Sequence, residues 1–185
     1  MGHHSSADIP QFDQLFGWFM RSFAMFEKSL LLTYLKASGI APRDGAKRFR
    51  TAGPSKLADL HKELLQTKQP SATELMQFER ARKQLMLIAE VRNDLAHFGV
   101  WFTPAYPLTT NFRVVTGAEP GNRIKVPLES FKAMMDDAGR LAMYFQRHVA
   151  EKIVGVEADF APEWLADWNY QVECVDNLGG VVAHK

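Results

Sequence analysis

Apolar residues recur at helical spacing over the first forty residues, and this pattern constrains the fold more than any other feature. Successive apolar positions lie three or four residues apart, which places them on one face of a helix. Asp8 can cap this helix, Pro10 suits its first turn, and Gly39 can end it. A long helix with such a stripe must bury it, so we expect a core or a dimer interface there. The stripe consists of Phe12, Leu15, Phe16, Phe19, Phe23, Phe26, Leu30 and Tyr34.

Three later segments also have helical patterns. A short helix is predicted from about Lys56 to Gln66. The next helix starts where Ser71 and Glu74 have the spacing of a capping box, and it ends near Gly99. A last long helix is predicted from about Leu128 to Val154, because its apolar residues again repeat at helical spacing.

Strand-like patterns lie between the last two long helices. The runs Asn111–Thr116 and Arg123–Val126 favour strands, and residues 117–122 can turn between them. Residues 100–110 contain two prolines and are predicted to be irregular. The expected fold class is therefore mainly α, a helical bundle of about four helices with a small β-hairpin inserted before the last long helix.

The length of 185 residues fits one domain with short flanking segments. We assign residues 1–8 to a disordered N-terminus or an expression remnant, and residues 9–155 to the helical domain. Residues 156–185 form a C-terminal extension that packs on the domain or at a dimer contact. His3 and His4 are not expected to be ligands, because a chain terminus is commonly unstructured.

Composition and charge exclude several classes of protein. The net charge of +1 gives no global attraction to nucleic acid or to a membrane, so any nucleic-acid site must be local. No stretch is apolar for long enough to span a bilayer, and we predict no membrane partner. The single cysteine, Cys174, has no partner for a disulfide or a zinc site, so we predict no metal and no cofactor. Such cysteine usage suits the cytoplasm.

A basic cluster lies in residues 40–54, which are rich in glycine and proline and are predicted to form a loop. Two interpretations stay open. The cluster is a patch that contacts RNA phosphates, or it is an ordinary solvated loop, which is the more common origin of such composition. The residues concerned are Arg43, Lys47, Arg48 and Arg50.

Polar residues gather late in the helix that begins after Ser71. With a turn of about 100° per residue, Glu90, Asn93, Asp94 and His97 fall on one polar face, with Arg92 beside it. Titratable residues grouped at a helix end mark a candidate site, and structural ion pairs produce the same pattern.

The segment Arg92–His97 resembles the motif of the HEPN superfamily. That motif is an Arg and a His separated by about four to six residues, and a polar residue, often Asn, follows the Arg. Here Asn93 follows Arg92, and His97 comes after three more residues. The motif lies late in a long helix, as in that family. Outside residues 85–99 the resemblance is only architectural, and the hairpin and C-terminal extension look like additions.

The resemblance implies a metal-independent endoribonuclease with a composite site formed by two protomers. His97 would handle the proton of the ribose 2′-hydroxyl, Arg92 would stabilise the phosphorane-like transition state, and Asn93 would position them. Histidine titrates near neutral pH, and the guanidinium fork matches phosphate oxygens. Cleavage would leave a 2′,3′-cyclic phosphate and spare DNA. Glu90 and Asp94 would be supporting residues, although both carboxylates repel phosphate.

The angle between Arg92 and His97 makes the dimer part of this hypothesis. Five residues correspond to about 140° around a helix, so the two side chains do not point the same way. Either the Arg92 side chain curls round, or the helix loosens at Gly99, or Arg92 meets the motif of a second copy.

Three hypotheses about function remain open. The chain is a homodimeric ribonuclease in a toxin, phage-defence or stress response, controlled by an antitoxin or another regulatory protein. Alternatively, it is a catalytically inactive HEPN-like module for binding or dimerisation. Third, it is a plain helical scaffold in which Arg92 pairs with Glu90 or Asp94 in a surface network.

Overall fold

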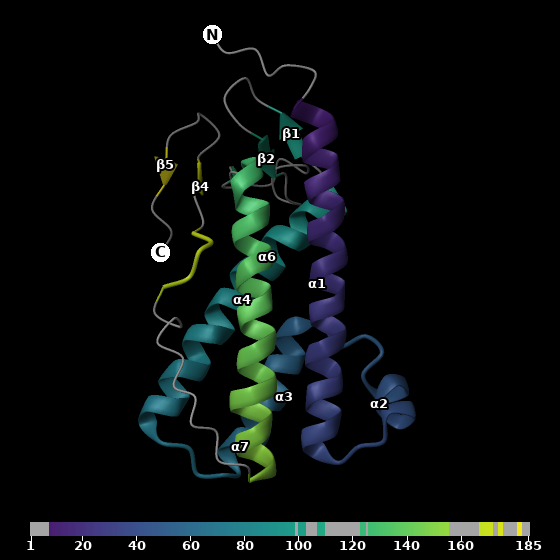
Figure 1. The fold of residues 1–185 in the computed structure, drawn as a ribbon, viewed down its shortest axis with the longest axis vertical. Coiled ribbons are helices and arrows are strands. Elements are labelled where there is room, and N and C mark those ends of the chain that lie inside the picture. The colour runs from purple at the N-terminus through teal and green to yellow at the C-terminus, as the bar shows by residue number, and fades with distance from the viewer. Residues whose placement is uncertain are drawn as a thin grey trace, which may run out of the picture. The chain divides into compact units, whose positions relative to one another are not determined.

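The fold is mainly α, as predicted (Figure 1). The computed structural model describes residues 8–98, 100–102, 107–109, 123–124, 126–155, 167–171, 174–175 and 181–182. The helices are α1 (Asp8–Ser38), α2 (Pro42–Arg48), α3 (Pro54–Gln66), α4 (Ala72–Phe98), α6 (Leu128–Met143), the π-helix η1 (Tyr144–Ala150) and α7 (Glu151–Val154). The strands are β1 (Val100–Phe102), β2 (Pro107–Thr109), β3 (Arg123–Ile124), β4 (Cys174–Val175) and β5 (Val181–Val182).

The chain divides into two compact units, and α1, α4 and α6 each contribute to both. Unit 1 comprises Met1–Arg21, Leu87–Met135 and Asn169–Lys185, whereas unit 2 comprises Ser22–Met86 and Asp136–Trp168. The predicted segment boundaries at residues 8 and 155 are not tested by this division and stay predictions.

Unit 1 has an aromatic core. The ring of Phe131 from α6 lies 5.0 Å from that of Phe12 and 5.8 Å from that of Phe19, both on α1. Val91 and Leu95 of α4 are also buried. Burial of these two aliphatic side chains fixes which side of the last turns of α4 faces the protein interior.

The strands of unit 1 differ from the predicted hairpin. β1 pairs antiparallel with β2, so the prediction of an irregular segment over residues 100–110 is wrong. β3 pairs with β4, and β4 pairs with β5. Residues 111–122 of the predicted hairpin lie outside the described residues. Since the described strand β3 pairs with β4, far along the chain, the local hairpin is not supported.

Unit 2 also has an aromatic core, and its helix starts follow the sequence signals. The ring of Phe145 lies 5.1 Å from that of His61 and 5.7 Å from that of Phe78. The capping box is confirmed, because the Ser71 N–H donates to Glu74 Oε2 at 2.7 Å and the Glu74 N–H donates to Ser71 Oγ at 3.2 Å. These two bonds satisfy backbone donors that the first turn of α4 leaves open.

The segment of residues 40–54 is not entirely a loop, which corrects the prediction. Pro42 starts the short helix α2, in a position where its missing N–H costs nothing. Gly45 is buried in α2, and a Cβ there would lie 2.2 Å from a Leu35 methyl carbon of α1. Glycine at this position therefore allows α2 to approach α1 closely.

The last long helix has the predicted limits and a feature that the sequence pattern does not reveal. α6, η1 and α7 follow one another without a break from Leu128 to Val154, and Gly155 ends them with a left-handed φ of 81°. The seven residues of η1, near the C-terminal end of this run, are π-helical. None of the helices in the described part of the chain combines the length and apolarity that a bilayer crossing requires.

Candidate functional site

The three residues of the predicted motif lie in the last two turns of α4, within unit 1. Asn93 and His97 are exposed, and Arg92 is half-buried. Val91 and Leu95 are buried and anchor the opposite side of the helix. Two of the three motif side chains are therefore open to solvent, and their helix is held in place by the apolar contacts of Val91 and Leu95.

Arg92 and Asn93 are joined by a hydrogen bond. Arg92 Nη1 donates to Asn93 Oδ1 at 2.9 Å. Asn93 lies one turn before His97, at about 40° from it around the helix. This hydrogen bond holds the Arg92 guanidinium beside Asn93, on the side of the helix that also carries His97.

The two supporting carboxylates have different environments. Glu90 is exposed, as expected for the polar face, but Asp94 is only 9% exposed. On the helix Asp94 lies at the edge of the polar arc, about 60° from the buried Val91. Of the two carboxylates, Glu90 is therefore the one presented to solvent beside Asn93 and His97.

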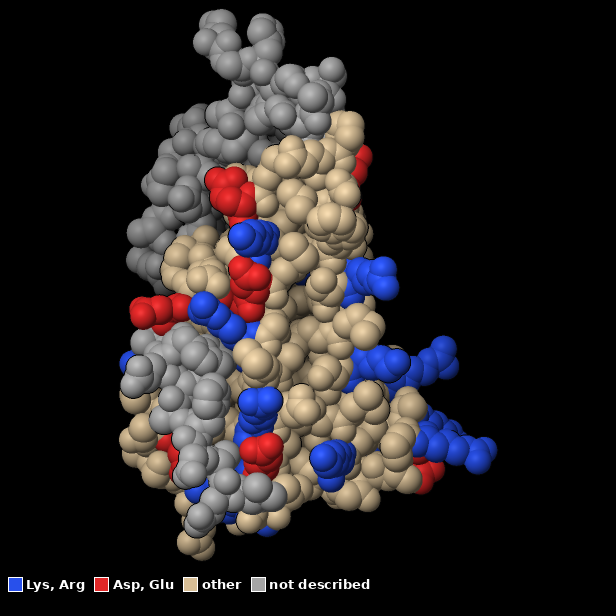
Figure 2. All heavy atoms as spheres, in the orientation of Figure 1, with Lys and Arg blue, Asp and Glu red and all other residues tan. Residues whose placement is uncertain are grey.

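The basic residues predicted to contact RNA lie in unit 2. All four are exposed, three in α2 and the fourth in the turn that follows (Figure 2). The Arg48 guanidinium lies over the Phe49 ring, 5.2 Å from its centroid, which fixes the direction of one charge. Because the other three charged side chains are also exposed, two on α2 and one in the following turn, this segment offers several cations to a phosphate backbone. The residues are Arg43, Lys47, Arg48 and Arg50.

Buried polar residues in unit 2 were not singled out from the sequence. His61 is fully buried, its Nδ1 donates to the Leu57 carbonyl at 2.8 Å, and its Nε2 has no hydrogen-bond partner. Burial lowers the pKa of His61 to about 4. Gln84 donates to Asp137 at 2.9 Å, and both are buried. The sequence contains one signal for the burial of His61: this residue lies four positions from both Leu57 and Leu65, on the apolar face of α3.

Among the described residues, no three His, Cys, Asp or Glu side chains are arranged to hold a metal ion. Comparisons of the chain with models of protein families, with curated proteins and with solved structures returned no match. The function is therefore inferred from the chemistry of the described residues.

Proposed function

We propose that this chain is a metal-independent endoribonuclease of the HEPN type that acts as a homodimer with a composite Arg/His site. One observation carries the proposal: Arg92 reaches Asn93, which lies one turn before an exposed His97. A histidine and a guanidinium near one helix end are groups suited to RNA cleavage by its own 2′-hydroxyl, one as general base and the other as a phosphate-binding cation.

Each motif residue has a role in the proposed reaction. His97 accepts the proton of the 2′-hydroxyl, whose oxygen attacks the adjacent phosphorus. Arg92 stabilises the extra negative charge on the phosphoryl oxygens, and Asn93 holds the guanidinium in position. The bond from phosphorus to the 5′-oxygen breaks, and that oxygen takes up a proton from the second His97 of the dimer or from water. The products are a 2′,3′-cyclic phosphate and a 5′-hydroxyl.

The basic residues around α2 supply the proposed RNA-binding surface. Exposed arginines and lysines bind phosphates without regard to base sequence, and they add to affinity in a salt-dependent way. The chain as a whole has a net charge of only +1, so a local cluster is needed for RNA to bind. The proposed setting is a cytoplasmic toxin, phage-defence or stress response, with an antitoxin or another regulatory protein as partner.

The alternative is a catalytically inactive HEPN-like module that binds or dimerises. The exposed carboxylate of Glu90, on the same face as Asn93 and His97, favours this alternative because it repels phosphate. The motif would be exposed in a single chain if a second copy completes the site, and also if its residues form only a polar network on the surface. An assay on the purified dimer separates these hypotheses.

The test is incubation of the purified chain with labelled RNA in the presence of EDTA. We expect RNA to be cut to products that end in a 2′,3′-cyclic phosphate. An oligonucleotide of the same sequence with 2′-deoxyribose throughout is the matched control and should stay intact, because it lacks the attacking hydroxyl. RNA that binds but is not cut supports an inactive RNA-binding module. RNA that neither binds nor reacts rules out the nuclease and the RNA-binding module, and leaves only a dimerisation module or a plain scaffold.

A further inference from the structure

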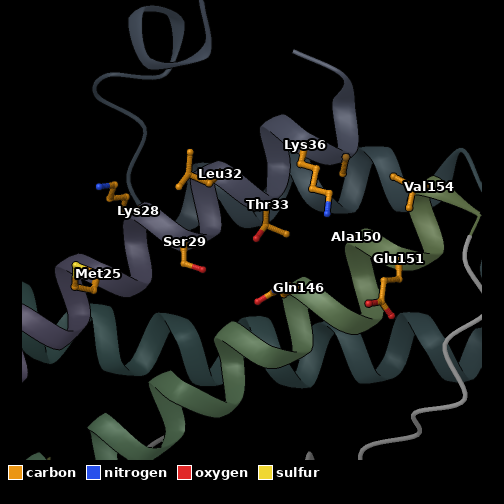
Figure 3. A pocket seen from close by; sticks show the side chains of 11 residues that line it. Met25, Lys28, Ser29, Leu32, Thr33, Lys36, Gln146, Ala150, Glu151 and Val154 are labelled. Carbon is orange, nitrogen blue, oxygen red and sulfur yellow. The ribbon is translucent and has the colours of Figure 1, made fainter. Parts of the chain in front are cut away.

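A groove runs along unit 2 between α1 and the helical segment formed by η1 and α7 (Figure 3). Its volume is about 500 Å³, and it is partly open to solvent. Seven lining residues belong to α1 and four to the opposite segment. They are Met25, Lys28, Ser29, Leu32, Thr33, Lys36, Ala37, Gln146, Ala150, Glu151 and Val154.

Small side chains line the groove on both of its sides. Ser29, Thr33 and Ala37 follow one another at intervals of four residues on α1, and Ala150 is buried on the opposite side. In Figure 3 the side chains of Ser29 and Thr33 point toward Gln146 across the gap. A row of small residues at this spacing is the complement of the ridge that side chains form on another helix.

The length of the groove also suits a helix. The lining residues of α1 extend over 13 positions, which at 1.5 Å per residue corresponds to roughly 18 Å, or more than three helical turns. A helix of that length can lay one face along the whole groove. A compact small molecule would fill only part of it.

Exposed apolar side chains border the groove. Met25 is 62% exposed, Leu32 46% and Val154 50%. Adjacent exposed side chains of this size are a common feature of surfaces that bind other proteins. Their apolar character favours a helix with its own apolar face over a nucleic-acid strand, whose backbone presents charge.

The charged residues that line the groove favour a binding partner of negative charge. Lys28 and Lys36 are exposed and lie about two turns apart on α1, whereas Glu151 is the one carboxylate among the lining residues. The lining therefore carries a net charge of +1. A second copy packed groove to groove would bring the same two lysines to this surface, so it is a poorer match than an acidic partner.

We propose that this groove binds an amphipathic, acidic α-helix of another protein. The apolar side chains of that helix pack between Leu32 and Val154, and its carboxylates pair with Lys28 and Lys36. Ser29 and Gln146 donate hydrogen bonds to its polar edge. This proposal does not rest on ribonuclease activity, because it concerns a binding surface in unit 2.

The probe is a synthetic 18-residue helical peptide of about five turns, with Leu along one face and Glu on both flanks. A second peptide, used for comparison, has Leu at the same positions and Lys in place of every Glu. Fluorescence anisotropy with the full chain should show the Glu peptide binding about tenfold more tightly than the Lys peptide at low salt. The double variant Lys28→Glu/Lys36→Glu should reverse this preference, and Lys68→Glu, an exposed charge change outside the groove lining, should not.

A second substitution tests the groove itself. Thr33→Trp places a large side chain in the groove and should weaken binding of the Glu peptide by about tenfold or more. Circular dichroism checks that the variant is folded. The proposal is overturned if the peptides bind equally, if neither binds at millimolar concentration, or if Thr33→Trp has no effect. It is also overturned if sedimentation shows self-association that Thr33→Trp abolishes, because a second copy then fills the groove.

Discussion

Replacing His97 with alanine is expected to lower the rate of RNA cleavage by roughly 10²–10⁴-fold, the range for loss of a general acid or base. Arg92→Ala should cause a loss of the same order, because no other guanidinium takes its place at Asn93. Neither change should unfold the protein. His97 is exposed, and α4 is anchored by the buried Val91 and Leu95 rather than by the motif.

The matched control is Arg80→Ala, which removes an exposed arginine from the same helix more than three turns away. This variant should cleave RNA at the wild-type rate. Thermal unfolding of all three variants checks that the fold is retained. Cleavage by His97→Ala at the wild-type rate rules out a role for this imidazole, and loss of activity in Arg80→Ala would point to general RNA binding instead.

Acidification from pH 7 to pH 4 is expected to destabilise the protein by about 3 kcal/mol through His61 alone. Burial lowers the pKa of His61 in the folded chain from 6.5 to about 4. The unfolded chain therefore takes up a proton near pH 6.5, and the folded chain does so only near pH 4. Stability is fully present above pH 6.5 and is lost as pH falls toward 4. His61 Nε2 is buried beside the rings of Tyr34 and Phe145 and has no hydrogen-bond partner, so nothing there stabilises the protonated form.

Chemical denaturation of wild type and His61→Gln at both pH values measures this contribution. The glutamine side chain stays neutral, so the loss of stability on acidification should shrink by about 3 kcal/mol in the variant. His148→Gln is the control: burial also lowers the pKa of His148, but this side chain is only half-buried, so the variant should keep most of the wild-type pH dependence. The same pH dependence in His61→Gln and in wild type would show that His61 does not carry the effect.

The long helices could be predicted because each has a local signal. An apolar stripe repeated over many turns, together with Asp8 and Gly39 at its two ends, located α1 to within one residue. Ser71 and Glu74 located the start of α4 in the same way, and both capping hydrogen bonds are present. Each of these signals relates residues at most four positions apart, so the local sequence is enough to locate the helices.

The errors have a different physical origin. Pro42 and Gly45 were interpreted as loop residues, whereas proline starts α2 and glycine makes room for Leu35 of α1. β1 and β2 were missed because two prolines occur between residues 100 and 110. The pairing of Arg123–Ile124 with Cys174–Val175 joins segments about fifty residues apart. A contact at that separation leaves no trace in a local pattern.

The candidate site was predictable as a helix face but not in its detail. The spacing placed Asn93 and His97 together, and both are exposed. It did not reveal that Asp94 is buried, because angle alone cannot tell how far the protein interior extends around a helix. The bond from Arg92 to Asn93 depends on a side-chain conformation, which the sequence does not specify.

Mixing two inactive variants tests the central claim, a composite site formed by Arg92 and His97 from two protomers. Arg92→Ala and His97→Ala are purified separately, allowed to exchange subunits and incubated with RNA in EDTA. Half of the exchanged dimers contain one of each, and each of these has one complete site. The mixture should therefore regain about one quarter of the wild-type activity. A mixture as inactive as its components, alongside an active wild type, would contradict a site shared between protomers.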